Sequence, residues 1–126
     1  MGLNVRITAG KVTASAELLE TPTAEAIGAA LPIRARAQRW GGEVYFSTSV
    51  AVGLEADARD LLEIGELGYW PPGKAFCIFF GRTPASDGEA PRAASAVNVF
   101  GKITGDVAGL WEVADGEEVI VEAEAS

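Results

Sequence analysis

The chain has 126 residues and a formal net charge of −8, with 48% hydrophobic and 22% charged residues. Those proportions are ordinary for a folded protein and the length suits one unit, so we expect a single domain over residues 1–126. An acidic surface repels phosphate groups, which argues against nucleic acid as a partner. Histidine is absent, which excludes Ser-His-Asp and Cys-His catalysis and His-ligated metal sites.

The beginning of the chain and its cysteine content both favour a cytoplasmic location. Residues 1–10 already alternate as a strand does, without the apolar stretch of a secretion signal. No apolar run approaches the ~18 residues that a membrane helix needs. Cys77 is the one cysteine, so an intrachain disulfide is excluded and a reducing compartment is expected. We therefore expect a cytoplasmic protein that does not bind membranes.

The first part of the chain predicts a hairpin and then a helix. Residues 3–8 and 11–18 alternate between apolar and polar types, and Ala9-Gly10 supplies the turn between them. Thr21 is a typical helix N-cap because it is followed by proline, the residue favoured at the first helical position. Pro32 ends the helix, since proline cannot continue it.

A second hairpin is predicted next. Residues 32–40 and 43–48 alternate again, with Gly41-Gly42 between them. Residues 49–64 are less regular. We expect this segment to cross the outside of the sheet, with one or two helical turns over 56–62.

Residues 65–83 form the most distinctive stretch of the chain. It combines a short aromatic strand, a rigid Trp70-Pro71-Pro72-Gly73 corner and an apolar strand over 75–80. The isomers of the two X–Pro bonds in the corner stay open. Cys77 lies inside the apolar strand without a histidine to activate it, so we expect a buried thiol rather than a nucleophile.

The last part of the chain predicts a long loop followed by strand, helix and strand. The loop, residues 83–96, has roughly fourteen residues, and loops of this length are often functional or mobile. A strand over 96–103, a short helix over 105–113 and a strand over 119–121 follow. With about eight short strands in all, we predict a mainly β fold, a closed antiparallel barrel with two short helices, because closure removes exposed sheet edges.

Three segments resemble a known family. Residues 17–25 resemble the strand-to-helix entry of cyclophilins, the peptidyl-prolyl isomerases, and Val97-Asn98-Val99-Phe100-Gly101-Lys102-Ile103 resembles a later cyclophilin strand. Residues 68–81 resemble the small prokaryotic cyclophilin-like proteins of uncharacterised function. The resemblance implies the eight-stranded cyclophilin-like barrel and no established activity.

The resemblance also implies that most of the isomerase site is lost. Arg39 matches the position of the cyclophilin arginine, with Arg36 as the alternative. Val44, Tyr45 and Ser47 stand where cyclophilins have Phe, Met and Gln. Ala75 replaces a glutamine and Cys77 replaces a pocket phenylalanine, while residues 83–96 contain neither the expected Trp nor the His. Isomerisation faces a barrier of ~18–20 kcal/mol. Without the pocket aromatic residues that hold and orient the proline ring, we expect no efficient isomerase.

We expect the remaining cleft to resemble a small-ligand or peptide site, which combines aromatic walls with a few polar groups. The candidate lining residues are Arg39, Trp40, Tyr45, Phe76 and Arg82. Further groups expected near the same cleft are Glu43, Glu66 and Tyr69. The sequence contains no cofactor motif and no metal-ligand cluster.

Three functions follow from these observations. The first is a module that binds a peptide or a small ligand without efficient catalysis. The second is a weak peptidyl-prolyl isomerase that depends on Arg39 or Arg36. The third is a homo-oligomeric assembly protein that uses the aromatic corner at Tyr69 and Trp70 as its contact surface.

Overall fold

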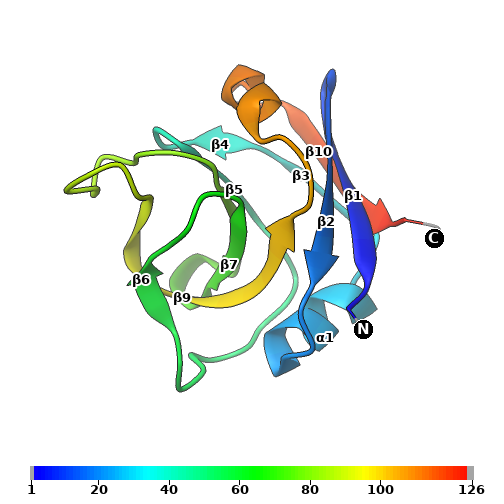
Figure 1. Cartoon of the computed structure of the whole chain (residues 1–126). Helices are drawn as coiled ribbons and strands as arrows, with labels where there is room; N and C mark the ends of the chain where they lie inside the picture. Colours follow the sequence, from blue (N-terminus) through cyan, green and yellow to red (C-terminus); the bar gives the residue numbers. More distant parts are fainter. Residues whose placement is uncertain (1, 125–126) are drawn as a thin grey trace.

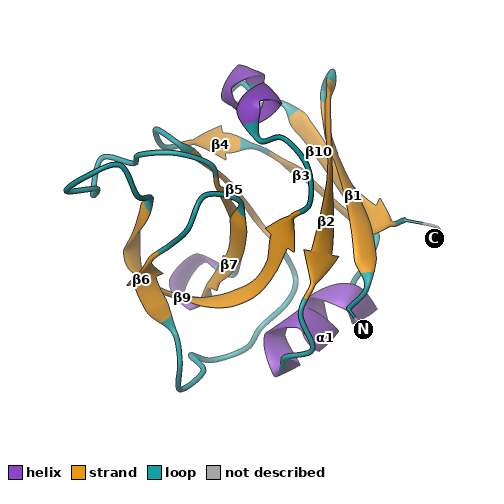
Figure 2. Cartoon of the chain, viewed as in Figure 1, coloured by secondary structure: helices purple, strands orange, loops and turns teal. Residues whose placement is uncertain are grey.

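The computed structural model describes residues 2–124, which fold mainly as antiparallel β-strands (Figures 1 and 2). The strands are β1 (Asn4–Ala9), β2 (Val12–Leu18), β3 (Ile33–Arg36), β4 (Gln38–Arg39), β5 (Glu43–Ser47), β6 (Arg59–Leu61), β7 (Glu66–Trp70), β8 (Ala75–Phe79), β9 (Arg92–Ile103) and β10 (Glu118–Ala123). The helical elements of this part of the chain are α1 (Pro22–Ala29) and the 3₁₀ helices η1 (Pro71–Gly73) and η2 (Ala108–Glu112).

The strands form one ten-stranded sheet in the order β3-β10-β1-β2-β9-β7-β8-β5-β4, with β6 paired to β9. The prediction of a closed, eight-stranded barrel is therefore corrected: the sheet is not closed by hydrogen bonds. Its two end strands, β3 and β4, are consecutive in the chain and meet at Ala37. The backbone of Ala37 bonds at 2.8 Å to Glu117 and to Gly116, so the chain leaves β10 at this residue before it joins β5.

The first hairpin and the first helix agree with the sequence. β1 and β2 pair from Asn4↔Glu17 to Ala9↔Val12. Thr21 caps α1, since its Oγ1 accepts a hydrogen bond from the N–H of Ala24 at 3.1 Å. Figure 1 shows α1 at one end of the sheet, below β1 and β2.

The other helical expectations need correction. The predicted second helix is the five-residue 3₁₀ helix η2, whose buried anchor is Leu110. The predicted turns over 56–62 contain strand β6 instead. Within residues 2–124 the one cis peptide is Leu31–Pro32, so both X–Pro bonds of the Trp70-Pro71-Pro72 corner are trans.

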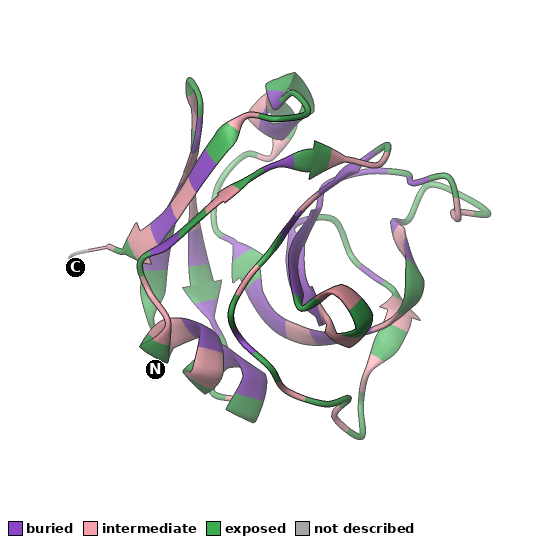
Figure 3. Ribbon diagram, turned by 180° about the vertical axis from the view of Figure 1, so that it is seen from behind, coloured by how far each residue is buried: buried purple, intermediate pink, exposed green. Residues whose placement is uncertain are grey.

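Two hydrophobic clusters lie on opposite faces of the central strands. The main core contains Phe76, which stacks on Phe46 with ring centroids 4.9 Å apart and meets Phe100 edge-on at 5.0 Å. The smaller cluster, on the outer face, consists of Leu62, Ala75, Cys77, Phe79, Ala93 and Val97. Strand β8 is buried along its whole length because it contributes side chains to both clusters. Figure 3 shows that buried residues gather on the strands, whereas the loops are largely exposed.

Buried Asn98 fixes the irregular segment over 49–58 to the rest of the fold. Its side-chain oxygen accepts from the N–H of Glu55 at 2.8 Å, and its amide nitrogen donates to Gly53 at 2.9 Å and Thr23 at 3.0 Å. Glu55 in turn accepts from the backbone and hydroxyl of Thr23, at the start of α1. The predicted crossing segment is thus held by polar contacts rather than by helical turns.

Candidate functional site

A cavity of about 260 Å³ opens on the outer face of the sheet. It lies over β5, β7, β8 and the first half of β9. Its lining residues are mainly aromatic or small and apolar: Trp40, Glu43, Tyr45, Trp70, Cys77, Ala93, Ala94 and Val97. Tyr45 and Cys77 are direct partners in the β5–β8 ladder, and side chains of paired residues lie on the same face of a sheet.

Two of the five predicted lining residues, Trp40 and Tyr45, contact this cavity. Phe76 does not, because neighbouring side chains of a strand point to opposite faces. Since Cys77 faces the cavity, Phe76 faces the main core, where it is fully buried. Arg82 lies on the surface, 3.9 Å from Glu89.

Arg39 is also outside the cavity lining, and its guanidinium has structural partners. Nη1 donates to the carbonyls of Trp111 at 3.0 Å and Val113 at 2.8 Å, while Nε and Nη2 donate to Gly41 at 3.1 and 2.8 Å. The same group lies 5.3 Å from the ring centroid of Phe80 and 5.5 Å from that of Trp111. The alternative arginine, Arg36, donates to the carbonyl of Gly116 at 2.9 Å.

Glu43 is the acidic group of the cavity, and its residue is only 6% exposed. Burial raises the pKa of its carboxyl to about 7, an effect that a hydrogen bond with Cys77 partly offsets. Burial, with a smaller contribution from Glu43, raises the pKa of the Cys77 thiol well above its usual value. The thiol therefore stays protonated at neutral pH, which agrees with the expected buried cysteine and argues against a nucleophile.

The polar atoms of two lining aromatic residues are bonded to residues outside the lining. The indole N–H of Trp70 donates to the hydroxyl of Ser95 at 2.7 Å. The hydroxyl of Tyr45 donates to the side chain of Gln38 at 3.1 Å. These bonds fix the two rings and leave their apolar surface as the main contribution to the cavity.

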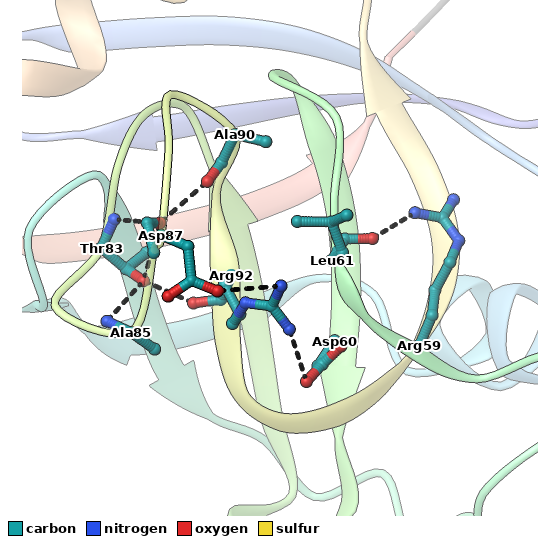
Figure 4. Close-up of polar contacts among 9 residues, drawn as sticks. Arg59, Asp60, Leu61, Thr83, Ala85, Asp87, Ala90 and Arg92 are labelled. Carbon is teal, nitrogen blue, oxygen red and sulfur yellow. Dashed lines mark hydrogen bonds and ion pairs between the residues drawn. The ribbon is translucent and has the colours of Figure 1, made fainter.

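Of residues 83–96, Ala93 and Ala94 line the cavity. Both belong to a strand rather than to the predicted loop, because β9 begins at Arg92. Figure 4 shows how the segment is held. The Arg92 guanidinium lies 3.2 Å from Asp60 and 3.6 Å from Asp87, and the Thr83 hydroxyl donates to the Arg92 carbonyl. These contacts position Ala93 and Ala94 at the cavity.

Glu66 does not line the cavity; its carboxylate instead binds Arg59 and so holds β6 against the sheet. Arg59 donates to both of its carboxylate oxygens, at 2.9 and 2.7 Å. Burial raises the pKa of Glu66, but the Arg59 bonds and the Glu63 N–H outweigh it, so the pKa lies below its usual value. Tyr69 is also absent from the lining, since it is fully buried and its hydroxyl donates to the carbonyl of Val50.

Sequence reasoning did not find Trp70, Ala93, Ala94 and Val97 as lining residues. The sequence marks Trp70 only as part of the proline corner, and small residues carry no chemical signature. The unusual length of the 83–96 segment was the signal that pointed to this region. Among residues 2–124, no group of three acidic, Cys or His side chains is placed to hold a metal ion, and no helix is long and apolar enough to cross a membrane.

The comparisons with known proteins agree with the fold. The sequence pattern of the cyclophilin-like family matches residues 3–122, whereas no curated protein matches the chain. The solution structure of a hypothetical protein from Archaeoglobus fulgidus is similar, with 48% sequence identity and a TM-score of 0.84. The match covers 98% of this chain and 95% of the archaeal chain. This chain therefore belongs to the cyclophilin-like family.

Proposed function

We propose that this protein is a binding module whose outer-face cavity takes a small ligand or one side chain of a peptide, without efficient catalysis. The observation that supports it best is the cavity itself, which combines three aromatic residues with one buried carboxyl group. Ligand sites are typically concave and apolar with a few placed polar groups. The volume of about 260 Å³ lies just below the ~300 Å³ where sites for drug-sized molecules begin, which favours a small occupant.

The resemblance to cyclophilins supports the same location. Tyr45 and Cys77 stand at the positions of the cyclophilin methionine and pocket phenylalanine, and both line the cavity. By this resemblance, the cavity would correspond to the isomerase cleft, with a thiol where the ring of the phenylalanine would be.

The weak-isomerase alternative is less well supported. A guanidinium near the prolyl nitrogen would have to lower the barrier of ~18–20 kcal/mol. Both candidate groups instead donate to backbone carbonyls, Arg39 to three residues and Arg36 to Gly116. The assembly alternative loses one of its two contact residues, because Tyr69 is fully buried. Homo-oligomer formation and a cytoplasmic location stay predictions, for which solution mass and cell fractionation are the tests.

Blocking the cavity is expected to abolish ligand-induced stabilisation. Two neutral probes suit its size: N-acetylproline methylamide, as a minimal peptide, and cyclopentanol. A probe that binds only the folded state at ~100 times its Kd raises the free energy of unfolding by about 2.7 kcal/mol. Ala94→Trp places a large ring at the lining, whereas Ala90→Trp is a matched control in the same exposed segment, outside the lining.

The measurement is the thermal midpoint of each variant with and without probe. We expect at least one probe to raise the midpoint of the wild-type protein and of Ala90→Trp, but not of Ala94→Trp. Equal shifts in both variants would contradict binding in this cavity.

A further inference from the structure

We propose that the ligand of this cavity is a small organic cation, an alkylated ammonium group that contacts Trp40, Tyr45 and Trp70 and is neutralised by Glu43. The inference rests on the binding role proposed above and adds the chemical class of the ligand. It follows from three features of the cavity: an acidic group without a cationic partner among the described residues, aromatic walls and a limited volume.

The carboxyl group of Glu43 has no cationic partner in the part of the chain that the structure describes. Basic side chains on neighbouring strands form ion pairs with other acids instead: Arg59 with Glu66, Arg92 with Asp60, and Lys102 with Glu63. A buried carboxylate without a partner is costly. Glu43 is only 6% exposed, yet it lines the cavity. A cationic ligand bound in the cavity would therefore supply the missing partner.

The aromatic walls indicate that the cation carries alkyl groups. Aromatic faces attract cations through their quadrupole, and quaternary and methylated ammonium groups are recognised in this way. Tyr45 and Trp70 already donate their hydrogen bonds to Gln38 and Ser95, so they have no free donor for a ligand in the cavity. A bare ammonium would recover only its contact with Glu43 for the water shell that it loses there, whereas methyl groups would pack against Ala93 and Val97.

The volume limits the size of the cation. At about 260 Å³, the cavity holds the liquid volume of roughly nine water molecules. That suits a head group such as trimethylammonium with a short chain. It does not suit a polycyclic molecule.

The charge state of Glu43 adds a pH dependence. The titratable groups that line the cavity beside it are Cys77 on β8 and Tyr45 on β5, and the lining from β7 and β9 is not titratable. Burial raises the pKa of Glu43 to about 7, while a bound cation favours its ionised form. Cation affinity is therefore expected to rise as the pH increases through about 7, and binding below that pH is expected to release a proton.

A pair of isosteric probes tests the charge directly. Choline carries a trimethylammonium group, and 3,3-dimethylbutan-1-ol has the same shape without the charge. Isothermal titration near pH 8, about one pH unit above the pKa of Glu43, is expected to give a Kd for choline at least ~10-fold lower than for the neutral alcohol. Glu43→Gln, which keeps the shape of the side chain, is expected to reduce that preference to about threefold or less, the part that the aromatic faces supply on their own.

Each alternative outcome is decisive. Equal or tighter binding of the neutral alcohol to the wild-type protein would overturn the cation proposal and leave the binding module intact. A preference for choline of unchanged size in Glu43→Gln would also overturn it, because Glu43 would then contribute nothing to the recognition of the cation. Absence of binding by both choline and the alcohol would overturn the cation proposal, and the neutral probes of the blocking experiment then decide the binding module separately. Amide spectra of Glu43→Gln establish that the variant is folded.

Discussion

Replacing Glu43 by glutamine is expected to stabilise the protein at about pH 8 and to change its stability little at about pH 4. In the folded state burial raises the pKa of Glu43 from 4.5 to about 7. The folded protein therefore holds this proton more tightly than the unfolded chain. As a result, the free energy of unfolding is highest in acid, where both states are protonated, and falls as the pH rises from about 4.5 to about 7. A shift of this size corresponds to about 3 kcal/mol. Urea unfolding of both proteins across this pH range measures the difference.

Glu66→Gln is the matched control and is expected to have the opposite sign. Its pKa is lowered in the folded state by the Arg59 bonds, so its stabilising effect is present at neutral pH and is lost as the pH falls through the folded pKa. The substitution should therefore destabilise the protein near neutral pH and cost progressively less in acid. If the effect of Glu43→Gln were the same at both ends of the pH range, the carboxyl of Glu43 would not be an acid with a raised pKa.

Arg39→Ala is expected to lower the free energy of unfolding by about 3 kcal/mol, because hydrogen bonds from a charged group and contacts with aromatic faces are lost together. The guanidinium joins the turn at Gly41 to the carbonyls of Trp111 and Val113. These carbonyls would lose their donors. Arg39→Lys should recover only part of the loss, since a single ammonium cannot reproduce the planar fork. Urea denaturation measures each change.

Arg36→Ala is the comparison variant. Arg36 makes one exposed hydrogen bond, to Gly116, so its replacement should cost less than about 1 kcal/mol. A proline-peptide exchange assay on the wild-type protein and the same two variants tests the isomerase alternative. We expect the wild-type protein to leave the rate of cis–trans exchange unchanged, so that neither substitution lowers it. A small stability loss in Arg39→Ala together with a loss of isomerase activity would contradict a structural role for Arg39.

The local parts of the fold were predictable from the sequence. The alternation in β1 and β2 sets their pairing, and Thr21 with the proline after it sets the start of α1. Both signals act within a few residues. The open seam of the sheet between β3 and β4 was not predictable, because the alternation over 32–40 continues through Ala37, where the chain changes from one partner strand to another.

The candidate site was predictable only in part, for two physical reasons. Strand β8 is apolar at every position, so no alternation shows that Cys77 faces the cavity and Phe76 the core. The second reason is distance along the chain: two of the three carbonyl partners of Arg39, those of Trp111 and Val113, are 72 and 74 residues away. Nothing near Arg39 in the sequence indicates that its guanidinium is already bonded.

The pairing of β6 was hidden in the same way. The strand is three residues long, too short for a reliable alternation pattern, and it pairs with β9 more than thirty residues later. Asp60 on β6 contacts Arg92, the first residue of β9. The sequence shows that the segment over 83–96 is unusually long, whereas the contribution of Ala93 and Ala94 to the cavity depends on this pairing.

Mapping a bound probe onto the backbone amides by NMR tests the central claim most directly. With cyclopentanol or choline near saturation, we predict the largest shifts at lining residues of the outer-face cavity, such as Tyr45, Cys77 and Val97. A second hollow, lined by residues that include Leu19 and Gly28 beside α1, is the internal control and should be unaffected. Shifts concentrated at Leu19 and Gly28, with Tyr45 and Cys77 unchanged, would contradict the assignment of the binding site.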